Sequence, residues 1–85
     1  MQIRVRLFAS LREAAGWGEA VREVPDGITV ADLLSALVQE EPRLALAASR
    51  TYAAVNYRYA PGETVLHDGD EVALFPPVSG GEVSK

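Results

Sequence analysis

The sequence predicts an α+β fold in which one main helix packs on one face of a sheet of four or five strands. Short apolar runs with a period of two recur between turn residues, which is typical of strands that bury one face. Only residues 29–41 combine the apolar period of a longer helix with capping residues. Because one helix covers one face of such a sheet, the other face is expected to be partly open.

Two strands and a short helical turn are predicted before the main helix. The first strand is predicted at residues 3–8, where apolar residues alternate with Arg4 and Arg6. Leu11–Ala15 is expected to form a short helical turn. A second strand is predicted over Glu19–Val24, and the Pro-Asp-Gly sequence that follows it indicates a turn.

The main helix has signals at both ends. Thr29 can cap its N-terminus, and Asp32 can complete a capping pair from the third helical position. Pro42 ends it, while Glu40 and Glu41 are expected to lie slightly unfavourably near the negative end of the helix dipole. Its apolar stripe, expected in the core, consists of Val30, Leu33, Leu34, Leu37 and Val38.

The C-terminal half is predicted to return to strands and turns. The expected elements, in order, are a short helix within Arg43–Ser49, a strand over Tyr52–Asn56, a type II turn at Ala60–Glu63, an extended piece at Thr64–Leu66, a turn at His67–Asp70 and a last strand at Glu71–Phe75.

Two phenylalanines are expected on the open face of the sheet. By strand alternation Phe8 points away from Leu7 and its apolar neighbours, and Phe75 points away from Leu74. Both would then lie where the chain leaves the domain. Such a pair favours a docking surface for a partner, although either ring could instead tuck under a loop.

Composition excludes several classes of function. The 85 residues are 48% hydrophobic and 24% charged, as in one ordinary globular domain, and no apolar run approaches the length of a membrane span. The alternating N-terminus is unlike a signal peptide, so a cytoplasmic location is expected. With no cysteine, disulfides, thiolate nucleophiles and zinc–thiolate sites are excluded. A net charge of −4 argues against nucleic-acid binding, and Arg4 and Arg6 are interpreted as a solvated strand face.

The sequence has no pattern typical of an enzyme's active site. His67 is the single histidine and falls in a predicted turn, where Asp68 and Asp70 are better explained by turn chemistry than by a metal site. No glycine-rich phosphate loop follows a strand, and no nucleophile–base pair is recognisable. Any reactive group is therefore expected to be the chain's own carboxyl end.

The end of the chain is predicted to be a projecting tail. A domain over residues 1–75 is followed by a tail over residues 76–85, in which Pro76 and Pro77 form a stiff step before Gly80 and Gly81. Extended, the segment from Pro76 to Gly81 reaches roughly 20 Å, enough to thread into a partner's active site. An isolated diglycine is otherwise commonly a frayed terminus.

Four segments together resemble the small, sulfur-carrier subunit of molybdopterin synthase, over residues 1–81 in order. They are Leu7-Phe8-Ala9-Ser10-Leu11-Arg12-Glu13, Ala54-Val55-Asn56, Asp68-Gly69-Asp70-Glu71-Val72-Ala73 and Phe75-Pro76-Pro77-Val78-Ser79-Gly80-Gly81. The resemblance implies a ubiquitin-like β-grasp fold with a mixed sheet. It implies a carrier that is not itself catalytic and holds no permanent cofactor.

The resemblance also implies the chemistry of the tail. An activating enzyme similar to the ubiquitin E1 class would use ATP with Mg²⁺ to adenylate Gly81, and a sulfur donor protein would convert it to a thiocarboxylate. The large synthase subunit would then receive the sulfur for the pterin precursor. Gly80 would give a narrow approach, and Phe75, Pro76, Pro77, Val78 and Ser79 would line the interface; Phe8 joins them by the face argument alone.

The chain departs from this family after the diglycine, because family members usually end there and this sequence continues over Glu82–Lys85. We favour removal of these four residues by a protease; a chain that tolerates another end and a relative that no longer carries sulfur are the alternatives. Other functions stay open as well: a sulfur carrier for thiazole synthesis or tRNA thiolation, a ubiquitin-like modifier, and a binding module with an inert tail.

Overall fold

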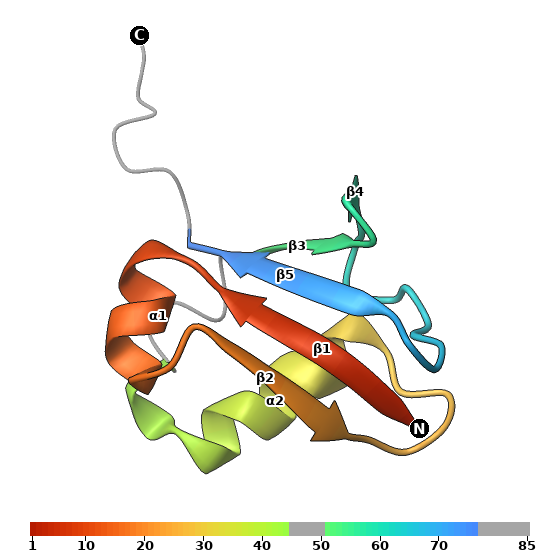
Figure 1. The fold of residues 1–85 in the computed structure, drawn as a ribbon, viewed down its shortest axis with the longest axis horizontal. Helices are drawn as coiled ribbons and strands as arrows, with labels where there is room; N and C mark the ends of the chain where they lie inside the picture. The colour runs from red at the N-terminus through yellow and green to blue at the C-terminus, as the bar shows by residue number, and fades with distance from the viewer. Residues whose placement is uncertain (45–50, 77–85) are drawn as a thin grey trace, which may run out of the picture.

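The computed structural model describes residues 1–44 and 51–76. Five strands and three helices occur within these ranges (Figure 1). In chain order they are β1 (Gln2–Leu7), α1 (Ala9–Ala15), β2 (Glu19–Glu23), α2 (Val30–Glu40), the 3₁₀ helix η1 (Pro42–Leu44), β3 (Tyr52–Val55), β4 (Arg58–Tyr59) and β5 (Glu71–Phe75). None of the helices in these ranges could cross a membrane.

The strands form one mixed sheet in the order β2-β1-β5-β3-β4. The first and last strands, β1 and β5, lie side by side and run parallel, while the pairs β1–β2, β5–β3 and β3–β4 are antiparallel. Because β1 and β5 are parallel neighbours, their carboxyl ends meet at one edge of the sheet (Figure 1). The ends of two strands that are far apart in sequence are thereby brought together.

Strand alternation buries one face of this sheet, as predicted. Along β1 the apolar residues are at most 2% exposed, while the residues between them reach solvent, so one face of the strand is buried and the other is open. On β5 the buried residues are Val72 and Leu74, in register with Val5 and Leu7. The inner faces of the two central strands therefore form the middle of the core.

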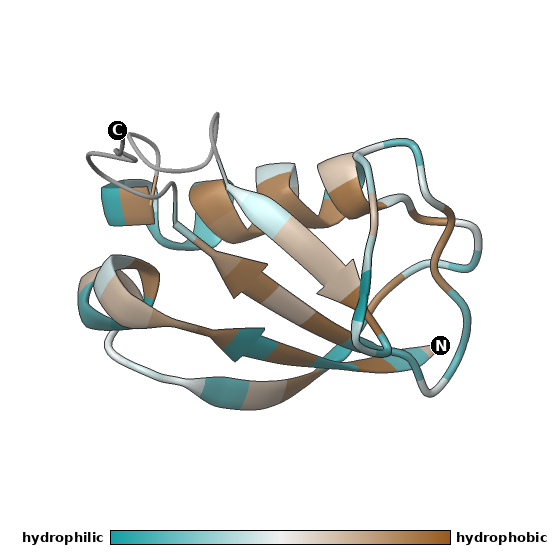
Figure 2. Cartoon of the chain, turned by 90° about the horizontal axis from the view of Figure 1, so that it is seen from above, coloured by the Kyte–Doolittle hydropathy of each residue, from teal (hydrophilic) through white to brown (hydrophobic). Residues whose placement is uncertain are grey.

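The main helix α2 covers the buried face (Figure 2). Its capping box forms as predicted: Thr29 Oγ1 accepts from the Asp32 backbone N–H at 3.1 Å, and the Asp32 carboxylate accepts from the Thr29 N–H at 3.1 Å. The predicted apolar stripe packs inward, with Val30, Leu33 and Leu37 buried and Leu34 and Val38 partly buried against the core. No helix among the described residues lies over the opposite face of the sheet (Figure 1).

Two arginines compensate the glutamates at the end of α2. Glu40 forms an ion pair with Arg22 from β2, and Glu41 forms one with Arg43 from η1. The expected unfavourable interaction of these carboxylates with the helix dipole is thus offset by cations that lie close to them. The sequence pattern of α2 alone could not show this, because Arg22 comes from another element.

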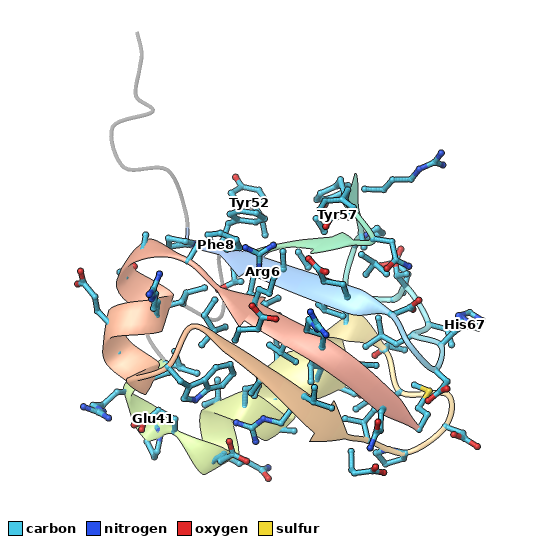
Figure 3. The ribbon with its side chains drawn as sticks, viewed as in Figure 1. Arg6, Phe8, Glu41, Tyr52, Tyr57 and His67 are labelled. Carbon is cyan, nitrogen blue, oxygen red and sulfur yellow. The ribbon has the colours of Figure 1, made fainter. Side chains whose placement is uncertain are left out.

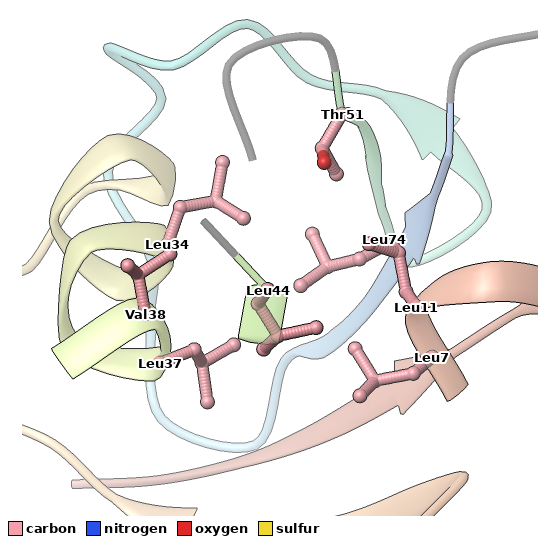
Figure 4. Close-up of a pocket in the computed structure, with 8 residues that line it drawn as sticks. All are labelled: Leu7, Leu11, Leu34, Leu37, Val38, Leu44, Thr51 and Leu74. Atoms are coloured by element: carbon pink, nitrogen blue, oxygen red, sulfur yellow. The ribbon is translucent and has the colours of Figure 1, made fainter. Parts of the chain in front are cut away.

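The core is closely packed. An apolar gap between α1, α2, η1 and the sheet encloses a volume of only about 10 Å³, close to the least that one water molecule needs (Figure 4). Its lining residues are Leu7, Leu11, Leu34, Leu37, Val38, Leu44, Thr51 and Leu74. This gap is therefore too small to hold an organic ligand.

The structure differs from the prediction at three places. Helix α1 begins at Ala9, two residues before the predicted start, and Ala9 has a positive φ of 51° at the point where the chain leaves β1. The strand β4 was not predicted. The type II turn at Ala60–Glu63 is wrong: the turn's hydrogen bond joins the Thr64 N–H to the Pro61 carbonyl, and Gly62 lacks the positive φ that a type II turn requires.

Other boundaries agree closely. The second strand ends at Glu23 instead of Val24, and the last strand has the predicted bounds. Of the helix predicted within Arg43–Ser49, only the part in η1 is described, and residues 45–50 lie outside the described residues. The boundary between a domain at 1–75 and a tail at 76–85 stays a prediction, because only Pro76 of that tail is described.

Candidate functional site

The candidate site lies on the uncovered face of the sheet, at the edge where β1 and β5 end. Leu7 is in register with Leu74, and the Phe8 N–H donates to the Leu74 carbonyl at 3.2 Å, so the chain is still tied to β5 as it leaves β1. Phe75 is in register with Tyr52 on the other side. Three neighbouring chain segments therefore bring aromatic residues to one edge, directly before the tail.

Phe8 and Phe75 stack on each other. Their ring centroids are 4.6 Å apart and their planes differ by 11°. Phe75 is 37% exposed and Phe8 is half-buried. A stacked pair of this kind contributes about 0.5–1.5 kcal/mol beyond its buried area. The expected position of both rings on the open face is confirmed; their part in docking stays a prediction.

Sequence reasoning missed two tyrosines that extend this surface. Tyr52 lies beside Phe75 and is 52% exposed, and Tyr59, which is 73% exposed, faces Ala54 across the β3–β4 pair. We call the surface formed by Phe8, Phe75, Tyr52 and Tyr59 the aromatic face. Phe8 and Tyr52 are labelled in Figure 3. The alternation of Tyr52 with buried Ala53 was a signal for it, but Tyr59 could be placed only once β4 was known.

The two arginines of β1 are paired with glutamates. Arg4 Nη1 lies 3.1 Å from Glu19 Oε2, and Arg6 Nη1 lies 3.2 Å from Glu71 Oε2. The Arg6 guanidinium carbon also lies 5.2 Å from the centroid of the Phe8 ring. These cations are therefore compensated within the sheet surface, which supports the interpretation of a solvated strand face over that of a basic stripe.

The acidic turn before β5 has a structural use, as predicted. Asp70 accepts from the His67 N–H at 2.8 Å and from Asn56 Nδ2 at 2.9 Å, and Asp68 accepts from the Gln2 N–H at 2.7 Å. These bonds fasten the start of β5 to β1 and to the β3–β4 turn. No group of three or more potential metal ligands occurs within residues 1–44 and 51–76.

Most of the predicted tail lies beyond what the structure describes. Pro76 is half-buried directly after β5. Pro77, Val78, Ser79, Gly80 and Gly81 lie outside the described residues, so their predicted roles rest on the sequence. The structure does show where the tail begins. We call this point, at the end of β5 beside the Phe8–Phe75 stack, the root of the tail.

Comparison with protein families and curated proteins identifies similar sequences. The model described as the ThiS family matches residues 5–81. The chain is 41% identical over 83 residues to the molybdopterin synthase sulfur carrier subunit of Chlamydomonas reinhardtii, covering 95% of this chain and 100% of that protein. It is 43% identical over 84 residues to the protein of the same name from Mycobacterium tuberculosis, covering 95% and 99%.

Solved structures show the same fold. The crystal structure of small archaeal modifier protein 1 from Haloferax volcanii matches with a TM-score of 0.78 and 32% identity, covering 91% of this chain and 98% of that one. A chain in the complex of subunits 1 and 2 of the molybdopterin-converting factor from Helicobacter pylori matches with a TM-score of 0.67 and 28% identity, covering 95% and 100%. The predicted ubiquitin-like β-grasp fold is confirmed.

Proposed function

Because this chain belongs to the ThiS family, we propose that it is the sulfur-carrier subunit of a molybdopterin synthase. The observation that supports this most strongly is near-full-length identity above 40% to two proteins named for that role. The family match also includes the whole Phe75–Gly81 motif and ends at Gly81. The chain is then a carrier whose chemistry is completed in the active sites of other proteins.

The proposed reactive group is the carboxylate of Gly81. A free carboxylate is a poor electrophile, so an activating enzyme similar to the ubiquitin E1 class first transfers AMP from Mg²⁺-bound ATP to it and releases pyrophosphate. Sulfur at the oxidation level of hydrosulfide, supplied by a donor protein, then attacks the acyl carbon, and AMP leaves as the acyl–phosphate bond breaks. The product is a thiocarboxylate at Gly81, and Gly80, without a Cβ, leaves the reacting carbonyl accessible in a narrow channel.

The proposed acceptor is a pterin precursor held by the large synthase subunit. The tail would enter that subunit's active site while the aromatic face docks outside, with Phe8 and Phe75 as anchors at the root of the tail. Pro76 and Pro77 would keep the tail extended, and Val78 and Ser79 would line the entrance. The similarity to a chain from a two-subunit complex supports this assembly. Two sulfur atoms require two deliveries by carriers.

Residues 82–85 must be removed before this chemistry, because an internal glycine has no carboxylate. We propose that a protease cleaves after Gly81. The activating enzyme and the large subunit then act on the trimmed chain alone.

A reconstitution tests the proposal with three matched chains: one ending at Gly81, one ending at Gly80 and the full sequence. Each is incubated with an activating enzyme, ATP and a sulfur donor, and its intact mass is measured. We expect only the chain ending at Gly81 to exchange one oxygen for sulfur and to support synthesis of molybdopterin by the large subunit. Equal activation of the uncleaved full chain would refute the role of Gly81.

A second candidate is a ubiquitin-like modifier, which the similarity to small archaeal modifier protein 1 favours. The same activated Gly81 would then form isopeptide bonds with lysines of target proteins. High-mass conjugates that disappear when Gly81 is deleted would support this role. Labelled sulfur that appears in thiazole or in tRNA instead of the pterin would indicate a carrier for another pathway.

A further inference from the structure

We propose that Arg6 is a positioning residue that holds Phe8 on Phe75 and so orders the docking surface at the root of the tail. The identity of the partner, the large synthase subunit, rests on the proposed function. The ordering itself is a property of the isolated chain. Arg6 therefore acts through Phe8 and has no part in the chemistry of the tail.

A continuous row of contacts carries this inference. Arg6 Nη1 lies 3.2 Å from Glu71 Oε2, and the guanidinium carbon lies 5.2 Å from the Phe8 ring centroid, within the range of a cation–π contact (Figure 3). Phe8 in turn stacks on Phe75 at 4.6 Å. The side chains of Arg6 and Glu71 are only 38% and 23% exposed, so this row is partly shielded from solvent.

The sheet register explains why Arg6, and not Arg4, has this position. Arg6 lies on β1 two residues before Phe8, which directly follows the strand in an extended conformation, so the two side chains share one face of the sheet. In register, Arg6 lies opposite Glu19 of β2, but the Glu19 carboxylate contacts Arg4 at 3.1 Å. Arg6 pairs instead with Glu71 at the start of β5, the strand that ends in Phe75.

Glu71 is a firm anchor for this pair. Its backbone N–H donates to Asn56 Oδ1 at 3.0 Å, and its carbonyl accepts from the Asn56 N–H at 2.8 Å. The backbone that carries the carboxylate is therefore fixed by two bonds to the β3–β4 turn. The Arg6 guanidinium is held by this carboxylate and at the same time lies over the Phe8 ring.

Ordering of Phe8 before docking has a consequence for affinity. An exposed ring that is free to rotate loses conformational entropy when a partner buries it, whereas a ring already held in place loses less. Removal of the Arg6 guanidinium should therefore weaken binding even if Arg6 never contacts the partner.

The test compares Arg6→Gln with Arg4→Gln in the chain ending at Gly81. Both variants remove one arginine from the same strand face, so their effects on net charge and long-range attraction are matched. Arg4 has a glutamate partner but contacts no aromatic ring among the described residues. We expect Arg6→Gln to weaken binding to the large subunit about two- to fivefold more than Arg4→Gln.

A measurement on the isolated chain supplies a second readout. The ring-proton NMR signals of Phe8 should move, and its contacts to Phe75 should weaken, in Arg6→Gln but not in Arg4→Gln. Glu71→Gln removes the carboxylate that holds Arg6, so it should shift the Phe8 signals in the same direction. The double variant with Arg6→Gln should show little further change, because both substitutions remove the same Arg6–Glu71 interaction.

Equal affinities of the two arginine variants, or unchanged Phe8 signals in Arg6→Gln, would overturn the proposal. If the unsubstituted chain failed to bind the large subunit, the proposed function would be wrong instead. The ring signals would still decide whether Arg6 orders Phe8.

Discussion

Glu41 shows how a single residue at a helix end depends on its neighbour. Hydrogen bonds from the Arg43 side chain, at 2.8 Å and 2.9 Å, lower the pKa of Glu41 from its ordinary 4.5 to about 2, with desolvation acting in the opposite direction. The Arg43 backbone N–H, at 3.3 Å, adds to the lowering. The ionised carboxylate is therefore the form that the folded chain favours.

This shift predicts the pH dependence of one variant. Because the pKa of Glu41 is lower in the folded chain, its contribution to stability is complete above pH 4.5 and is lost as pH falls to about 2. Glu41→Gln should thus unfold more easily than the parent at pH 7 and should match it near pH 2. Urea unfolding followed by fluorescence of the single tryptophan, Trp17, measures both.

Glu63→Gln is the matched control, since Glu63 is exposed and forms no ion pair among the described residues. It should differ little from the parent at either pH. A destabilisation by Glu41→Gln that is the same at pH 2 as at pH 7 would contradict the assigned cause.

The β3–β4 hairpin shows where element prediction fails. Its two-residue turn has Asn56 at φ 51° and Tyr57 at φ 71°, a pattern of positive φ values that favours Asn-Gly. Because Tyr57 and not glycine occupies the second position, the sequence lacks the Asn-Gly pattern that would have predicted this turn. The strand β4 also has only two residues, too few for a recognisable period. The apolar periods of β1, β5 and α2 were predictable because each element has several residues and packs against the core.

Tyr57→Gly is expected to stabilise the hairpin. The left-handed conformation costs an ordinary residue about 1–2 kcal/mol, whereas glycine loses about 0.4–1 kcal/mol through the unfolded chain, so a net gain of roughly 0.5 kcal/mol should result. Tyr57 is 83% exposed, so little packing is lost. The midpoint of urea unfolding measures the gain.

Tyr57→Ala separates the two causes, because it removes the ring and keeps the Cβ atom. It should not stabilise the chain. If alanine and glycine raised the unfolding free energy equally, the positive φ of Tyr57 would not be the source of the strain.

At the scale of the whole molecule, the site depends on a pairing that local patterns do not reveal. Alternation alone placed Phe8 and Phe75 on the open face. Their stacking follows from the parallel contact of β1 with β5, two strands at opposite ends of the chain. The Arg6–Glu71 pair has the same origin, with a separation of 65 residues. Such contacts require the topology, which the sequence predicted only through family resemblance.

The whole fold can then be understood as a support for its last strand. Hydrogen bonds from the acidic turn fix the start of β5, α2 covers its inner face, and the aromatic face surrounds its end. A strand fixed in this way holds Phe75 and Pro76, from which the tail continues. In the proposed function the tail carries Gly81 into a partner's active site.

The intact mass of the protein isolated from its own cells tests the central claim most directly. We predict a chain that ends at Gly81, with a fraction heavier by the exchange of one oxygen for one sulfur. A native chain that always retains Lys85 and never carries sulfur would contradict the claim.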